Sequence, residues 1–183
     1  MLNRFLFVII LLFFSIIFFS FEDNGLGLSK NALKKVEKTF LQLWPERMVS
    51  WEKVLITEDA RRALSFDIKS DQLFRLKDNE SLVGYLYVDG APGKFDRFDY
   101  MVIFSPDLTI LNVSVLVYRE DYGGEIGSMR WLNQFTGKKD GRGMEFKEDI
   151  QGISGATISV LSISSGIKKL SLNIQELRNL GVI

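Results

Sequence analysis

Five short apolar runs between residues 50 and 120 constrain the fold of this chain more than any other feature. Their valine, isoleucine, leucine and aromatic residues follow an alternating period, and turn-forming segments such as KDNE, DGAPGK and SPDLT separate them. The runs are SWEKVLIT (50–57), DQLFRLKD (71–78), SLVGYLYVDG (81–90), FDYMVIFS (98–105) and TILNVSVLVYRE (109–120). Such runs predict β-strands. We therefore expect a mostly antiparallel sheet, whose last two strands form a hairpin through Pro106 and Asp107.

Helical spacing of apolar residues flanks these runs on both sides. Residues 30–44 carry one apolar stripe, with Ser29 as the expected cap and Pro45 as the end of the helix. Residues 158–177 carry a longer stripe and predict a helix that docks on the sheet. Between the sheet and this last helix, SMRWLNQF (128–135) predicts a short helix with Met129, Leu132 and Phe135 on one side. The fold class is therefore α+β.

The amino-terminal run FLFVIILLFFSIIFFSF, Phe5 to Phe21, contains no charged residue. A run of this length is close to the lower limit of about 17 residues for a membrane span. It is longer than the core of a signal peptide, and no small-x-small cleavage site follows it. We interpret it as a single transmembrane anchor, with a signal peptide as the alternative. Arg4 before the run and Glu22 and Asp23 after it predict that the remaining chain lies outside the cytoplasm.

The composition excludes several kinds of chemistry. The chain has no histidine and no cysteine, so imidazole or thiolate metal sites, iron–sulfur clusters, disulfides and Ser-His-Asp triads are absent. Lysine plus arginine equals aspartate plus glutamate, at 23 each. Because no net field favours a polyanion, nucleic acid is not an expected partner. Redox chemistry would therefore require a bound cofactor.

The stretch GISGATISV, Gly152 to Val160, places four small residues directly before the last helix. One interpretation is a helix cap, in which a serine or threonine hydroxyl accepts a hydrogen bond from the first turn. The other is a phosphate site, because a helix amino terminus offers free N–H groups and a positive dipole end. Ser154, Thr157 and Ser159 would add hydroxyl groups there. The usual nucleotide-binding glycine patterns are missing from the chain.

The segment ISGATIS, Ile153 to Ser159, resembles the Ser/Thr-Gly-Ala-Thr flavinylation motif of FMN-binding domains. These domains occur in the C subunit of the sodium-pumping NADH:quinone oxidoreductase, in the G subunit of the Rnf complex and in small membrane-anchored relatives. The segment YREDYGGEIGSMRWLNQFTGK, Tyr118 to Lys138, also resembles the family layout, and the likeness extends over about residues 70 to 178. It implies that a separate magnesium-dependent flavin transferase joins FMN, taken from FAD, through its phosphate to the hydroxyl of Thr157.

The resemblance also implies which residues surround the cofactor. We expect the phosphate near Ser154, Gly155, Ala156 and Ser159, and the flavin ring near the loop of residues 120–127. The loop residues expected to contact the ring are Glu120, Tyr122, Gly123, Gly124 and Gly127. Trp131 is expected in the core rather than against the ring. No catalytic residue and no metal ligand is expected in the chain itself.

The predicted organisation is a membrane anchor or uncleaved signal at 1–22, a linker and amphipathic helix at 23–45, and an FMN-binding domain at 46–183. The expected protein is an electron carrier, rather than a stand-alone enzyme, on the periplasmic side of a bacterial cytoplasmic membrane. Its expected partners are the flavin transferase and a membrane redox partner. Gln151 stands where the family usually has an aspartate, six residues before the threonine. The alternatives are a noncatalytic assembly module that has lost flavin and a small flavin-dependent reductase.

Overall fold

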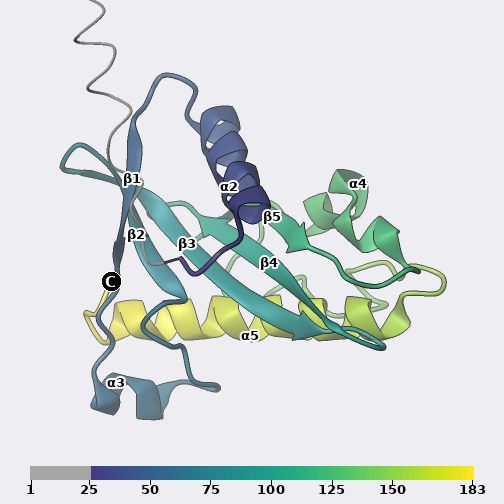
Figure 1. Cartoon of the computed structure of the whole chain (residues 1–183). Coiled ribbons are helices and arrows are strands. Elements are labelled where there is room, and N and C mark those ends of the chain that lie inside the picture. Colours follow the sequence, from purple (N-terminus) through teal and green to yellow (C-terminus); the bar gives the residue numbers. More distant parts are fainter. Residues whose placement is uncertain (1–25) are drawn as a thin grey trace, which may run out of the picture.

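A five-stranded sheet, in which each strand pairs antiparallel with its neighbour in the chain, forms the centre of the fold (Figure 1). The strands are β1 (Val49–Lys53), β2 (Leu73–Asp78), β3 (Ser81–Pro92), β4 (Arg97–Phe104) and β5 (Ile110–Val117). Each strand overlaps one predicted run, so the predicted antiparallel sheet is confirmed. The β4–β5 hairpin at Pro106 and Asp107 is also present, with Leu108 N–H donating to the Ser105 carbonyl at 2.9 Å.

The computed structural model describes residues 26–183. The expected anchor, Phe5 to Phe21, lies outside these residues. Among the described residues, no helix has both the length and the apolar character needed to cross a membrane.

Two helices cover opposite faces of the sheet, which gives three layers. In Figure 1, α5 (Thr157–Asn179) runs along one face and α2 (Lys30–Leu43) crosses the other. Side chains of β4 alternate between the two layers, as a strand requires. Phe98, Tyr100, Val102 and Phe104 pack in the cluster with α5, whereas Met101 and Ile103 pack in the cluster with α2. Burial on both faces therefore fixes the register of the central strands.

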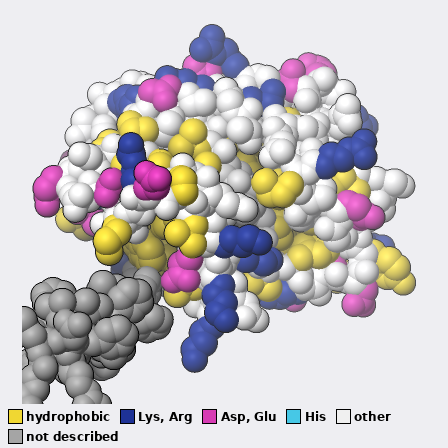
Figure 2. Space-filling view, turned by 90° about the horizontal axis from the view of Figure 1, so that it is seen from above, with side chains coloured by type: hydrophobic (Ala, Val, Ile, Leu, Met, Phe, Trp, Pro, Cys, Tyr) yellow, Lys and Arg dark blue, Asp and Glu magenta, His cyan; other side chains and the backbone are white. Residues whose placement is uncertain are grey.

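Helix α2 begins and ends where the sequence predicts. The hydroxyl of Ser29 accepts a hydrogen bond from the N–H of Ala32 at 3.3 Å. The helix ends at Leu43, two residues before Pro45. On the face of the molecule seen in Figure 2, basic and acidic groups are interspersed, and neither sign forms a single patch.

One helix was not predicted, and one predicted short helix does not bury all three of its expected apolar residues. The unpredicted helix is α3 (Glu58–Ala63), which is held by its Thr57 cap and is too short to show an apolar period. The short helix after the sheet is α4 (Met129–Leu132), followed by the 3₁₀ turn η2 (Asn133–Phe135). Leu132 and Phe135 are buried, whereas Met129, which the sequence places on the same side, is 51% exposed. Trp131 is buried instead and packs edge-on against Phe135, so its expected core position is confirmed.

A buried hydroxyl in α5 yields a stability prediction. Ser164 is 1% exposed, and its Oγ has no hydrogen-bond partner among the described residues. Because an unpartnered buried hydroxyl is unfavourable, we expect Ser164→Ala to raise the free energy of unfolding by about 1 kcal/mol. Ser162 on the same helix is the matched control, because its hydroxyl donates to the carbonyl of Pro92 at 2.6 Å. Ser162→Ala should destabilise the domain. Equal destabilisation by both substitutions in urea denaturation would contradict the prediction.

Candidate functional site

A tight turn leads directly into α5. The N–H of Ala156 donates to the carbonyl of Ile153 at 3.2 Å, and Gly155 has a φ of +78°, which glycine adopts without strain. Thr157 is the first residue of the helix, and Ala156 is its cap without any side-chain hydrogen bond. The interpretation of a hydroxyl cap at this helix is therefore wrong, because the turn places alanine at the capping position. The exposed Thr157 hydroxyl is not used for capping.

Two hollows lie on either side of this turn. The smaller one, which we call the α5 hollow, has a volume of about 180 Å³. It is lined by Lys94, Glu120, Gly155, Ala156, Thr157, Ile158 and Ser159. The larger one, which we call the Trp131 hollow, has a volume of about 390 Å³. It is lined by Glu125, Ser128, Arg130, Trp131, Gln134, Gln151, Gly152 and Ile153.

Glu120 ties the β3–β4 turn to the end of β5. Its Oε1 accepts hydrogen bonds from the N–H groups of Phe95 at 2.6 Å and Asp96 at 3.2 Å. The bond from Phe95 is the main cause that lowers the pKa of this carboxyl below its ordinary value. A Cβ at Gly93 would lie 2.5 Å from the same oxygen, so glycine is needed for this approach. Glu120 therefore fixes the backbone of the β3–β4 turn, which forms one side of the α5 hollow.

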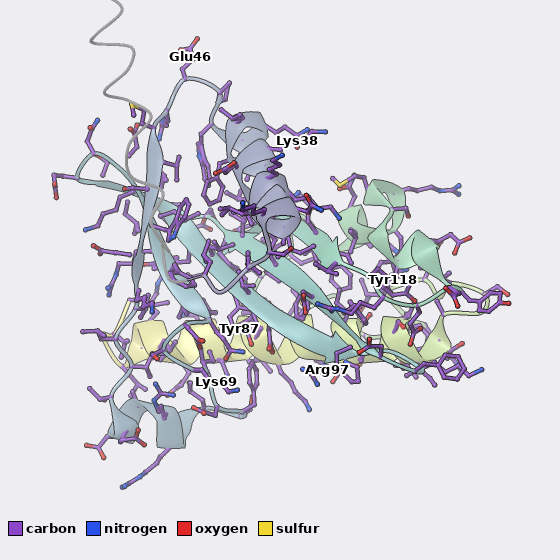
Figure 3. The ribbon with its side chains drawn as sticks, in the orientation of Figure 1. Lys38, Glu46, Lys69, Tyr87, Arg97 and Tyr118 are labelled. Atoms are coloured by element: carbon purple, nitrogen blue, oxygen red, sulfur yellow. The ribbon has the colours of Figure 1, made fainter. Side chains whose placement is uncertain are left out.

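The loop after β5 packs against the start of α5. Gly123 has a φ of +77°, and a Cβ at this position would lie 2.8 Å from the Cβ of Ala156. The hydroxyl of Tyr118 donates to the carbonyl of Tyr122 at 2.9 Å, which holds the loop in place. Burial is the largest cause that raises the pKa of Tyr118. Figure 3 shows Tyr118 at the end of the molecule where α5 begins.

Trp131 and Gln134 hold the backbone just before the turn. The indole Nε1–H of Trp131 donates to the carbonyl of Gln151 at 2.7 Å. The N–H of Gln151 in turn donates to Oε1 of Gln134 at 2.8 Å. This explains the three-residue spacing of tryptophan and glutamine, since both side chains reach the backbone of one residue, Gln151. Gln151 itself is exposed and borders the Trp131 hollow.

The structure brings together only some of the residues predicted from the sequence. The α5 hollow collects the predicted residues Glu120, Gly155, Ala156, Thr157 and Ser159. The other predicted residues, Ser154, Tyr122, Gly123, Gly124 and Gly127, line neither hollow, and Tyr122 is 78% exposed.

The sequence interpretation did not place Lys94 or Ile158 of the α5 hollow, or Ser128, Arg130 and Gln134 of the Trp131 hollow, at the cofactor site. The segment DGAPGK did predict the turn that carries Lys94. Only strand pairing, however, brings this turn to the start of α5, more than 60 residues later in the chain.

The residues present fit a phosphate-bearing cofactor. The first turn of α5 has no side-chain cap, and the lysine of the α5 hollow supplies a positive charge. Free N–H groups and the helix dipole favour an anion at this position. The larger hollow across the turn offers an indole edge and amide groups. Among residues 26–183, no group of three or more acidic side chains could hold a metal ion.

Comparisons with known proteins agree with this geometry. Residues 93–171 match the model of the family described as FMN-binding domain. This segment runs from the β3–β4 turn into α5 and contains both hollows, so the match indicates FMN as the cofactor. No curated protein matches the chain in sequence. Among solved structures, the crystal structure of Shewanella oneidensis NqrC matches with a TM-score of 0.53 and 14% identity. The match covers 83% of this chain and 100% of that chain, and at this identity it concerns the fold.

Proposed function

From the premise that residues 93–171 carry an FMN-binding domain, we propose that this chain is an electron carrier that holds FMN covalently through Thr157. The isoalloxazine ring supplies the redox chemistry, while the protein supplies its position and surroundings. The resemblance of ISGATIS to the flavinylation motif supports the attachment. The structural likeness to NqrC supports the fold that carries this motif.

The position of Thr157 is the observation that carries this proposal. Thr157 is exposed, and it is the first residue of α5. It lines the α5 hollow and lies in the segment that matches the family model. A threonine hydroxyl is a weak nucleophile unless a base or metal activates it. The other residues of the α5 hollow include no histidine, and Glu120 is engaged by backbone N–H groups. An external enzyme is therefore required to activate the hydroxyl.

The attachment reaction balances with FAD as the donor. A flavin transferase forms the bond between Thr157 Oγ and the phosphorus atom of the FMN half. The pyrophosphate bond of FAD breaks, AMP leaves, and the proton of the hydroxyl passes to a base of the transferase. Thr157 keeps all its other atoms, so the chain gains one FMN less one water. No electron is transferred in this step.

We place the carrier on the outer face of a bacterial cytoplasmic membrane, anchored by Phe5 to Phe21. The uncharged length of this run and the charges on either side of it support this assignment. The electron partner would then be a membrane redox protein, as in the family that the sequence resembles. Ser154, Tyr122, Gly124 and Gly127 remain proposed contacts of the bound flavin.

Intact-mass spectrometry of the full chain tests the proposal directly. The chain is produced in bacteria with a flavin transferase, purified in detergent and digested for peptide mapping. We expect a gain of one FMN less one water, located on the peptide that contains Thr157. An unmodified mass, from cells in which the transferase labels a control acceptor, would contradict covalent attachment. Bound yellow FMN without a mass gain would instead indicate a noncovalent site, in line with Gln151 at the position of the usual aspartate.

A further inference from the structure

We propose that Lys94 makes the α5 hollow selective for a phosphorylated flavin over the same flavin without its phosphate. This inference rests on the proposed function, because it concerns the same site. It adds a specificity-determining residue that lies outside the flavinylation motif and comes from a different part of the chain. Lys94 belongs to the β3–β4 turn, and it lines the hollow together with Thr157.

The size of the α5 hollow indicates which part of a flavin it can take. At about 180 Å³ it is smaller than the roughly 300 Å³ at which pockets for whole small molecules begin. The Trp131 hollow, at about 390 Å³, lies within that range. The α5 hollow therefore suits a compact group such as a phosphate rather than a whole flavin.

Lys94 supplies the positive charge at the α5 hollow. Lys94 is the only basic residue among those that line it, and it has no ion-pair partner among residues 26–183. Its ammonium lies over the Phe95 ring, 4.7 Å from the ring centre, and would exchange this cation–π contact for a bound anion. The only acidic residue of the lining, Glu120, accepts hydrogen bonds from the backbone N–H groups of Phe95 and Asp96. Its negative charge is thus partly balanced by those donors.

Hydrogen bonds of the β3–β4 turn hold the backbone of Lys94 beside the α5 hollow. The carboxylate of Glu120 accepts hydrogen bonds from the N–H groups of Phe95 and Asp96, which follow Lys94 in the turn. The N–H of Gly93, which precedes Lys94, donates to the Asp96 carbonyl at 2.8 Å and closes the turn. The hydroxyl of Ser162 in α5 also donates to the carbonyl of Pro92. Lys94 is therefore carried by a turn that is fixed to both β5 and α5. A phosphate at the start of α5 would meet the lysine on one side and the free N–H groups of the helix on the other.

Noncovalent binding separates the role of the charge from the attachment chemistry. The test uses the full chain in detergent with Thr157→Ala, which cannot be modified, and measures FMN and riboflavin affinity by quenching of flavin fluorescence. We expect Lys94→Gln to weaken FMN binding about fivefold at low salt, because an exposed charge contributes roughly 1 kcal/mol. Riboflavin binding should not change, and Lys94→Arg should restore FMN binding. Higher salt should reduce the preference for FMN only when Lys94 is present.

Lys38 provides a control for net charge. It lies exposed on α2, on the opposite face of the sheet from α5 (Figure 3), so Lys38→Gln should leave both affinities unchanged. An equal loss of FMN and riboflavin binding in Lys94→Gln, or an unchanged FMN affinity, would overturn the role of Lys94. If the mass experiment still finds FMN on Thr157 in that case, only this inference fails. If the chain carries no FMN and binds neither flavin, the proposed function fails with it.

Discussion

Replacing Thr157 with alanine will abolish covalent attachment of FMN and leave the fold intact. The hydroxyl is the proposed attachment point, and a methyl group offers no oxygen for the phosphoester. The threonine side chain makes no capping hydrogen bond, and the first turn is closed by the N–H of Val160 donating to the Ala156 carbonyl at 2.9 Å. Alanine is also the best helix former. We therefore expect complete loss of the mass gain, with a thermal midpoint within a few degrees of the unmodified parent chain.

Two further substitutions make this prediction specific. Thr157→Ser keeps the hydroxyl, so some modification should return at the same position. Ser165→Ala removes an exposed hydroxyl eight residues later, on α5 and outside the motif, and full modification should persist. A mass gain that survives Thr157→Ala would show that another residue is the acceptor. Peptide mapping of that protein would then locate the acceptor.

The sheet and its long helices were predictable because burial imposes a period on the sequence. β4 alternates between two packed layers, and α5 has apolar residues at helical spacing, so both patterns are visible without a structure. In contrast, α3 spans six residues and buries only Ala60, which leaves no period to detect. The cap of α5 was mispredicted for a related reason. Serine and threonine are favoured caps, but the turn at Gly155 shifts the capping position to Ala156.

The site was only partly predictable because its two walls are distant in the chain. The motif at residues 153–159 is local, so its place before a helix follows from the sequence. Lys94 lies 63 residues before Thr157, and only the pairing of β3 with β4 and the packing of α5 bring them together. Trp131 was expected in the core, and it is buried there. Its hydrogen bond to the Gln151 carbonyl, which connects the core to the motif, required the structure.

Gly123→Ala is expected to have the second-largest effect, because it combines two costs at one position. Alanine in a left-handed conformation costs about 1–2 kcal/mol, and the φ of Gly123 is +77°. The new Cβ would also lie 2.8 Å from the Cβ of Ala156 and 3.1 Å from the Tyr118 hydroxyl, and overpacking of this kind costs about 1–3 kcal/mol. We expect the free energy of unfolding to fall by about 2–5 kcal/mol in total.

The structural change in Gly123→Ala should be largest at the flavin site. To relieve the contact of the new Cβ with Ala156, either the loop or Ala156 must move, and Ala156 precedes the acceptor threonine. We therefore expect less FMN per chain by intact mass, in addition to a lower urea midpoint. Gly124→Ala is the matched control, because a Cβ there meets no atom within 4 Å and Gly124 has no positive φ. It should leave the free energy of unfolding close to that of the parent chain. If Gly123→Ala also behaves like the parent in both measurements, the close packing of this loop on α5 cannot be what positions Thr157.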